Sequence, residues 1–203
     1  MMVMSVPYES TGRTKQKART RAAVIQAARE LLSDGVTPTV EQAADTAGVS
    51  RTTAYRYFPN PRALIVATFP EIGAASLLPD TPPDDPAARL AAVVDALTSQ
   101  MVEHEPELRA HLRLSLESAN GERTDLPFRT GRAIGWIEEA LAPLRGQISE
   151  PDLRRLVLAI RSAVGIEALV WLTDIAGLSR AEAAELMHWS AQALLRSALN
   201  ETG

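Results

Sequence analysis

The chain contains no cysteine and few aromatic residues. Tryptophan, tyrosine and phenylalanine together make up 4% of its 203 residues. The absence of cysteine excludes a disulfide framework, a thiolate metal site and a cysteine nucleophile, and it favours a reducing compartment, so we expect a cytoplasmic protein. The positive charges Arg13, Lys15 and Lys17 follow the short apolar stretch 1–8 instead of preceding it, so no signal peptide is predicted.

Long uninterrupted apolar runs and strand-like alternation are also lacking. The most apolar stretch, 156–176, contains Arg161, Glu167 and Asp174, whereas a membrane-spanning helix needs roughly 20 predominantly apolar residues. We therefore expect no membrane partner. Alternation of β-branched residues is hard to find, while Ala, Leu, Glu and Arg dominate long segments, which favours helix. The sequence predicts an all-α fold.

Charge is divided unevenly along the chain. The net charge is −4, which by itself argues against a nucleic-acid partner. Up to Arg62, however, there are nine basic and five acidic residues, a net of +4, and the remainder carries −8. The N-terminal part thus has the charge of a segment that binds a polyanion.

The first predicted helix runs from about Thr14 to Gly35. Apolar residues at helical spacing give it one buried face, and glycine is a common residue just after a helix end. Its beginning is strongly basic, with Lys15, Lys17, Arg19 and Arg21. These side chains are expected to neutralise phosphate charge if the segment binds nucleic acid.

A helix-turn-helix is predicted directly after this helix. Thr39 with Gln42 three residues later is a capping box, which marks the start of a second helix. Gly48 suits the left-handed end of that helix, and Ser50 caps a third helix over 51–58. Two short helices joined by a three-residue turn with a glycine are typical of this DNA-binding motif.

The third helix has a polar exposed face that suits the major groove. At about 1.5 Å per residue, its eight residues span about 12 Å, close to the width of that groove. Arg51 can pair with guanine, threonines can contact bases, and tyrosine hydroxyls and Arg56 can hold phosphates. The expected DNA-contacting residues of this helix are Arg51, Thr52, Thr53, Tyr55, Arg56 and Tyr57.

The run from Thr39 to Ser50, followed by Arg-Thr-Thr-Ala-Tyr-Arg-Tyr-Phe-Pro-Asn and Leu64, resembles the DNA-binding domain of the tetracycline-repressor (TetR) family. The resemblance covers roughly residues 14–69. It implies an all-α homodimer with a three-helix N-terminal head, a ligand-binding body and usually repression. By position, it also implies DNA contacts from Thr39, Arg51, Thr52, Thr53, Tyr55 and Tyr57.

Two positions depart from the family pattern. Ala43 stands where the family usually has isoleucine, and Pro61 stands where it often has a lysine that contacts a phosphate. Arg62, next to this proline, is expected to supply the missing charge.

The domain organisation expected from these signals has three parts. Residues 1–12 form a flexible tail, residues 13–60 a helix-turn-helix head, and residues 61–203 a larger helical body for ligand binding and dimerisation. The segment Pro79–Pro86 has four prolines and three aspartates in eight residues, which is typical of a loop. Long helices are expected behind it, the last two over 150–176 and 180–200.

The body contains a candidate pocket and a candidate dimer interface. An apolar wall with few polar groups is usual for a small-molecule site. The predicted lining is Met101, Ile134, Trp136, Ile137, Glu167 and Trp171. The last helix carries small and apolar residues at helical spacing, and these are expected to form a homodimer contact: Ala184, Met187, Ala191, Leu194, Leu195 and Ala198.

Some features of the body allow two interpretations. Glu167 is either a ligand contact or half of a salt bridge to an arginine such as Arg132 or to a partner subunit. His104, Glu107 and His111 have a spacing that metal sites use, but Pro106 separates them, so we expect no metal and no cofactor. No serine has an arranged base beside it, so catalysis is not predicted.

These signals together favour a ligand-responsive transcriptional regulator, expected to be a repressor that binds a palindromic operator in double-stranded DNA. A small apolar effector would release it. The alternatives are a DNA-binding protein that responds to no ligand, and a helical carrier or enzyme with an accidental helix-turn-helix. An enzyme has no use for exposed Arg-Thr-Thr and tyrosines behind a capped turn, which favours the regulator.

Overall fold

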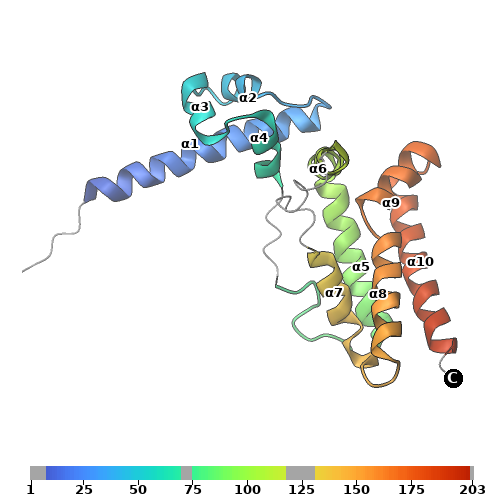
Figure 1. Cartoon of the computed structure of the whole chain (residues 1–203). Helices are drawn as coiled ribbons and strands as arrows, with labels where there is room; N and C mark the ends of the chain where they lie inside the picture. Colours follow the sequence, from blue (N-terminus) through green and yellow to red (C-terminus); the bar gives the residue numbers. More distant parts are fainter. Residues whose placement is uncertain (1–7, 70–74, 118–130, 202–203) are drawn as a thin grey trace, which may run out of the picture. The chain divides into compact units, whose positions relative to one another are not determined.

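The computed structural model describes residues 8–69, 75–117 and 131–201, and within these ranges it is helical without strands. A single isolated bridge joins Arg145 and Ile148. The chain divides into two compact units, Met1–Pro70 and Glu71–Gly203 (Figure 1). They are called the head and the body here. The predicted all-α fold is confirmed.

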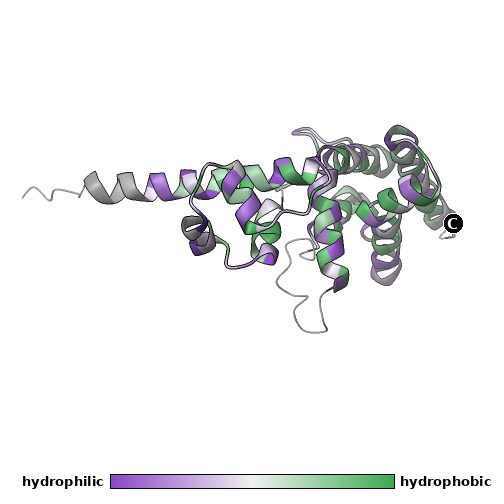
Figure 2. Cartoon of the chain, turned by 90° about the horizontal axis from the view of Figure 1, so that it is seen from above, coloured by the Kyte–Doolittle hydropathy of each residue, from purple (hydrophilic) through white to green (hydrophobic). Residues whose placement is uncertain are grey.

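The head consists of helices α1 (Tyr8–Ser33), α2 (Val40–Thr46), α3 (Arg51–Tyr57) and α4 (Pro61–Thr68). Helix α1 packs against each of the other three. Hydrophilic and hydrophobic residues alternate along α1, as expected for a helix with one buried face (Figure 2). The shared hydrophobic core is small; it consists of Val24, Ile25, Ala28, Val40, Ala43, Ala44, Ala54, Phe58 and Leu64.

The predicted turn between α2 and α3 is confirmed in its backbone geometry. The Thr39 hydroxyl accepts from the Gln42 amide at 3.1 Å, and the Gln42 side chain accepts from the Thr39 amide at 2.9 Å, which completes the capping box. Gly48 has φ +65°. Ser50 then caps α3 by accepting from the Thr53 amide at 3.3 Å.

The head differs from the expected boundaries at both ends. Helix α1 begins at Tyr8, within the expected tail 1–12, of which residues 1–7 lie outside the described residues. Helix α4 packs on α1 and places Leu64 in the head core, so it groups with the head and not with the body. The proline that starts α4 thus marks a helix start and not a domain boundary.

The body is built from α5 (Pro86–Glu103), α6 (Glu105–Glu117), α7 (Arg132–Ala140), α8 (Glu150–Ala163), α9 (Ile166–Val170) and α10 (Arg180–Glu201). The described part of the body also contains two short helices, the 3₁₀ helix η3 (Ala142–Leu144) and the π-helix η4 (Trp171–Ile175). Helix α10 packs on α5 and α8, and α7 packs on the same two helices (Figure 1). The expected capping box forms at the start of α10, where Ser179 and Glu182 each accept from the other's amide. At α8 only half of it forms: the Ser149 hydroxyl accepts from the Asp152 amide and donates to the Asp152 carboxylate.

Arg89 on α5 ties the end of α7 in place. Its guanidinium donates to the backbone carbonyls of Ala140 at 3.0 Å, Glu139 at 2.9 Å and Pro83 at 3.3 Å. The last carbonyls of a helix have no partners within the helix, so a cation is well suited to this position. One planar side chain thus joins α5 to α7 and to the loop before α5.

The predicted helix over 150–176 is wrong as a single element. It is interrupted at Val164 and Gly165, and its last part is the π-helix η4. The guanidinium of Arg161 folds over the interruption, and a Cβ at Gly165 would collide with it. The guanidinium of Arg161 therefore occupies the space that a Cβ at this position would take.

The segment Glu150–Ile175 is long and apolar enough, by length and composition alone, to cross a membrane. In the structure it is divided between α8, α9 and η4 and packs against α6, α7 and α10. Core helices of folded proteins share this composition, and the packing places the segment among them.

Candidate nucleic-acid interface

Helix α3 presents its polar side chains away from the head core. Ala54 and Phe58 are 0% and 2% exposed, and they anchor the inner face. Five of the eight residues expected to contact DNA are exposed: Thr39 before α2, and Arg51, Thr52, Tyr55 and Arg56 on α3. The other three, Thr53, Tyr57 and Arg62, are half-buried.

Three of the expected DNA contacts also have structural roles. The Thr53 hydroxyl lies 2.8 Å from the Ser50 hydroxyl in the cap of α3. The Tyr57 ring packs beside Phe58, with ring centroids 6.3 Å apart. Because the Thr39 hydroxyl accepts from an amide, its own proton stays available for a phosphate.

Acidic side chains of α2 already bind two of the α3 side chains. Arg51 Nη2 donates to Asp45 Oδ2 at 3.1 Å, and the Tyr55 hydroxyl donates to Glu41 Oε1. The hydrogen bond from Tyr55 lowers the pKa of Glu41, and the same bond raises the pKa of Tyr55. The bond to Asp45 raises the pKa of Arg51. No signal within either helix marks these pairs in the sequence.

The basic part of α1 lies on the same unit. Lys15, Lys17, Arg19 and Arg21 are all exposed. The guanidinium carbon of Arg21 lies 5.5 Å from the centre of the Phe58 ring, a cation–π contact that joins this part of α1 to the end of α3. Exposed cations and a capped helix with polar side chains thus lie on one small domain, the arrangement of a helix-turn-helix DNA-binding protein.

Comparisons with known proteins match part of the head to a known family. Residues 24–68 match the family described as bacterial regulatory proteins, tetR family. No curated protein matches the chain. This family consists of transcriptional regulators, so the matched part of the chain is a DNA-binding domain.

Solved structures resemble the chain beyond the head. The hemolysin II transcriptional regulator HlyIIR has a TM-score of 0.51 at 16% identity, covering 83% of this chain and 97% of that one. A TetR-family transcriptional regulator from Streptomyces coelicolor has a TM-score of 0.48 at 18% identity, covering 89% and 98%. The first likeness shows that the two proteins share a fold.

The structure does not gather the six expected pocket residues in one place. Met101 of α5 and Trp136 and Ile137 of α7 are buried, Ile134 is half-buried, and α5 packs on α7. Glu167 and Trp171 belong instead to α9 and η4 and are exposed. The interruption at Gly165 changes which way both side chains point relative to a continuous helix.

The salt bridge interpretation of Glu167 holds with a different partner. Its carboxylate lies 3.4 Å from Arg161 Nη1, and Arg161 also donates to the Val164 carbonyl. The sequence suggested Arg132 as the partner, but this ion pair forms with Arg161. The pair bridges the interruption between α8 and α9.

The expected dimer residues divide between the two faces of α10. Met187, Ala191 and Leu195 are at most 1% exposed, because this face of α10 packs on α5 and α8 of the same chain. These three side chains are not available to a second subunit, which corrects the expectation. Ala184, Leu194 and Ala198 are half-buried.

The possible metal ligands lie on two different helices. His104 ends α5, whereas Glu107 and His111 are buried on α6. Among the residues that the structure describes, no group of three histidine or acidic side chains is arranged to hold a metal ion.

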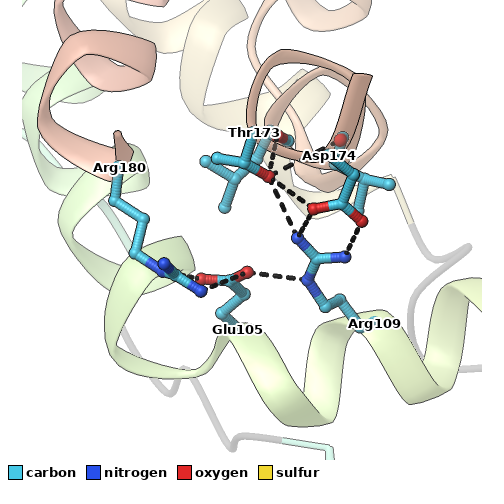
Figure 3. A network of polar contacts seen from close by, with 7 residues as sticks. Glu105, Arg109, Thr173, Asp174 and Arg180 are labelled. Atoms are coloured by element: carbon cyan, nitrogen blue, oxygen red, sulfur yellow. Dashed lines mark hydrogen bonds and ion pairs between the residues drawn. The ribbon is translucent and has the colours of Figure 1, made fainter. Parts of the chain in front are cut away.

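A polar network that the sequence analysis missed joins α6, η4 and α10 (Figure 3). Arg109 donates to both Asp174 oxygens at 2.6 and 2.8 Å and to Thr173 at 3.1 Å. It also donates to Glu105 at 2.7 Å, and Glu105 accepts from Arg180 at 2.6 Å. Glu105 is 4% exposed, so two arginines compensate a buried carboxylate.

The network fixes the π-helix to the body. The hydrogen bond from Arg109, helped by one from Thr173, lowers the pKa of Asp174 to about 2. Sixty-five positions separate Arg109 from Asp174 in the chain. A pairing at this distance leaves no pattern within a single helix from which it can be predicted.

We expect the stabilisation from ionised Asp174 to disappear in acid. Its pKa of about 2 in the folded chain lies below its ordinary value of 3.8, so the contribution is complete above about pH 4 and is lost as the pH falls towards 2. The stability difference between the wild type and Asp174→Asn should shrink over this range. Tryptophan fluorescence during urea unfolding measures it, because all three tryptophans lie in the body.

Asp84→Asn is the matched control, because Asp84 is an exposed acid in the loop before α5. Its effect should be small at every pH. A difference between wild type and Asp174→Asn that stays constant from pH 6 to pH 2 would contradict the role of the ion pair.

Proposed function

We propose that this regulator is a repressor that binds a palindromic DNA operator as a homodimer in the cytoplasm and is released by a small, mainly apolar effector. The observation that carries the proposal is the exposed face of α3, with Arg51, Thr52, Tyr55 and Arg56 behind a capped turn. Seven helical residues span about 10 Å, so α3 fits the major groove, which is about 12 Å wide.

The residues of the head divide into two classes of DNA contact. Arg51 stands at the first position of α3, where side chains of a recognition helix reach base edges. The cations of α1, the Thr39 hydroxyl and Arg62 suit phosphates, which position the protein without reading sequence. These classes differ in how mutation affects specificity.

Arg51→Ala should weaken binding to the preferred duplex by roughly ten- to a hundredfold and relax the base preference at one position of each half-site. Lys15→Ala is the matched comparison, because it removes a cation expected to contact only phosphate. It should weaken binding to all duplexes alike. The slope of the logarithm of affinity against the logarithm of salt concentration should become shallower by about one. Fluorescence anisotropy titrations at several salt concentrations distinguish the two.

If Arg51→Ala lowers affinity for every sequence equally, α3 does not read bases through this residue. If the wild type protects no site in footprinting, the proposal of an operator is wrong.

The dimer contact that we propose is the outer face of α8, η4 and α10. Of the ten large hydrophobic residues that are exposed among those described, six lie on these helices: Leu158, Trp171, Ile175, Leu186, Trp189 and Leu199. Trp171, Ile175 and Trp189 are 58%, 73% and 63% exposed. Apolar surface of this kind usually marks an interaction site, and a two-headed dimer suits a palindrome with half-sites about 34–36 Å apart.

Trp189→Glu should convert the dimer to a monomer at micromolar concentration, because a charge would be buried in the contact without a partner. Leu116→Glu is the matched control, since Leu116 is 72% exposed and lies on α6, which is not one of these helices. Sedimentation velocity measures the outcome. The monomeric variant should lose affinity for a full palindrome and keep its weaker affinity for a half-site.

A wild-type monomer at micromolar concentration would contradict the homodimer. Dissociation by both variants alike would place the contact elsewhere.

The effector site that we propose lies between α5 and α7. Met101 of α5 and Trp136 and Ile137 of α7 are buried, and the two helices pack on each other. Apolar side chains of this kind line most small-molecule sites. A ligand held there binds one conformation of the body better than another, so it shifts the population towards the conformation that it fits. Affinities for effector and DNA are then coupled in both directions.

Small apolar compounds that raise the melting temperature should weaken DNA binding by roughly 5- to 150-fold. The measurement is titration of each such compound into the preformed complex with DNA. Trp136→Phe should weaken the compound's binding, whereas Trp171→Phe, a change at an exposed tryptophan, should not. Compounds that stabilise the protein and never change its DNA affinity would favour a regulator that responds to no ligand.

A further inference from the structure

The acidic residues Glu41 and Asp45 of α2 face the reading side chains of α3. They lie four residues apart on one helix, and their partners Tyr55 and Arg51 lie four residues apart on the other. Positions four apart share a helix face, so the two contacts cross-link one face of α2 to one face of α3. Both pairs are accessible to solvent, and the side chains of Arg51 and Asp45 are 65% and 61% exposed.

We propose that Glu41 and Asp45 are specificity-determining residues that set which hydrogen-bonding groups α3 offers to bases. The inference deepens the proposed function and rests on it. Neither residue has to touch the DNA; each positions a side chain that does.

Stability accounts poorly for Asp45, whose contact with Arg51 is an exposed ion pair. An exposed ion pair typically contributes little to folding. Two carboxylates beside the reading helix also repel the phosphate backbone of every DNA sequence, which lowers affinity without discrimination. A role in selecting the right sequence explains their position, because discrimination requires contacts that penalise the wrong partner.

Asp45 positions Arg51 for a guanine. The guanidinium has five N–H donors, and the contact through Nη2 occupies one of them. The four remaining donors suffice for the paired contact to O6 and N7 of guanine. An arginine without this contact can swing to the nearest phosphate, where it would strengthen binding to any sequence.

Glu41 determines the role of Tyr55. The hydroxyl proton of Tyr55 is committed to the Glu41 carboxylate, so the oxygen that remains can only accept a hydrogen bond. In the major groove only adenine N6 and cytosine N4 carry donors. Tyr55 therefore favours adenine or cytosine over guanine or thymine, and it does not donate to a phosphate.

The experiment is selection of preferred duplexes from a randomised library with the full chain, followed by affinity measurements on the selected site, its single-base variants and scrambled DNA. The variants are Asp45→Asn, Glu41→Gln and Tyr55→Phe. Asp34→Asn is the matched control, because Asp34 is an exposed acid at the end of α1 and makes no side-chain contact in the described part of the chain. Circular dichroism melting verifies that each variant is folded.

Asp45→Asn should lower the preference for guanine at one position about tenfold, the scale of one paired base contact, and should strengthen binding to scrambled DNA. Glu41→Gln should relax the preference for adenine or cytosine at a second position, because an amide can donate to the Tyr55 oxygen as well as accept from it. Tyr55→Phe should relax the same position. Asp34→Asn should raise the affinity for all duplexes alike.

Two results overturn the proposal, and they are distinguishable. If Asp45→Asn and Glu41→Gln change all affinities in the same proportion as Asp34→Asn, the acids act only by repulsion and the assignment is wrong. If the wild type enriches no sequence at all, the operator itself is contradicted and the assignment falls with it.

Discussion

The reading surface of this protein depends on the left-handed backbone at Gly48. With φ at +65°, the chain turns sharply enough for the Val49 amide to donate to the Ala44 carbonyl at 2.9 Å. Ser50 then caps α3, and Ala54 and Phe58 reach the core. A residue with a Cβ would be strained at this angle. The direction of the α3 side chains offered to DNA therefore follows from one turn.

The head was predictable because its signals are local. The capping box at Thr39, the glycine of the turn and the serine cap each lie within four residues of the atoms that they bind. The start of α1 at Tyr8 and the grouping of α4 with the head were not predicted, since helix length and packing partners depend on the whole unit. The contacts of Asp45 and Glu41 with α3 were missed for the same reason.

The body was predictable in its helix starts and not in its side-chain partners. Ser149 and Ser179 marked α8 and α10 correctly, because caps are local. Periodicity detected an apolar face on α10 but could not tell whether it faces its own chain or a second subunit. Met187 and Leu195 proved to be core residues, while Trp189 lies outside. The contacts of Arg161 with Val164 and Glu167 at the interruption follow from the fold, and no helical pattern encodes them.

The hydrogen bonds of Arg89 give any movement between α5 and α7 a threshold. A single rigid guanidinium holds two carbonyls at the end of α7 and one in the loop before α5. These bonds cannot stretch far, and because the group is planar, a shift that breaks one misaligns the others. Movement of α7 against α5 therefore breaks the two bonds to Ala140 and Glu139, while the bond to Pro83 stays within α5 and its own loop.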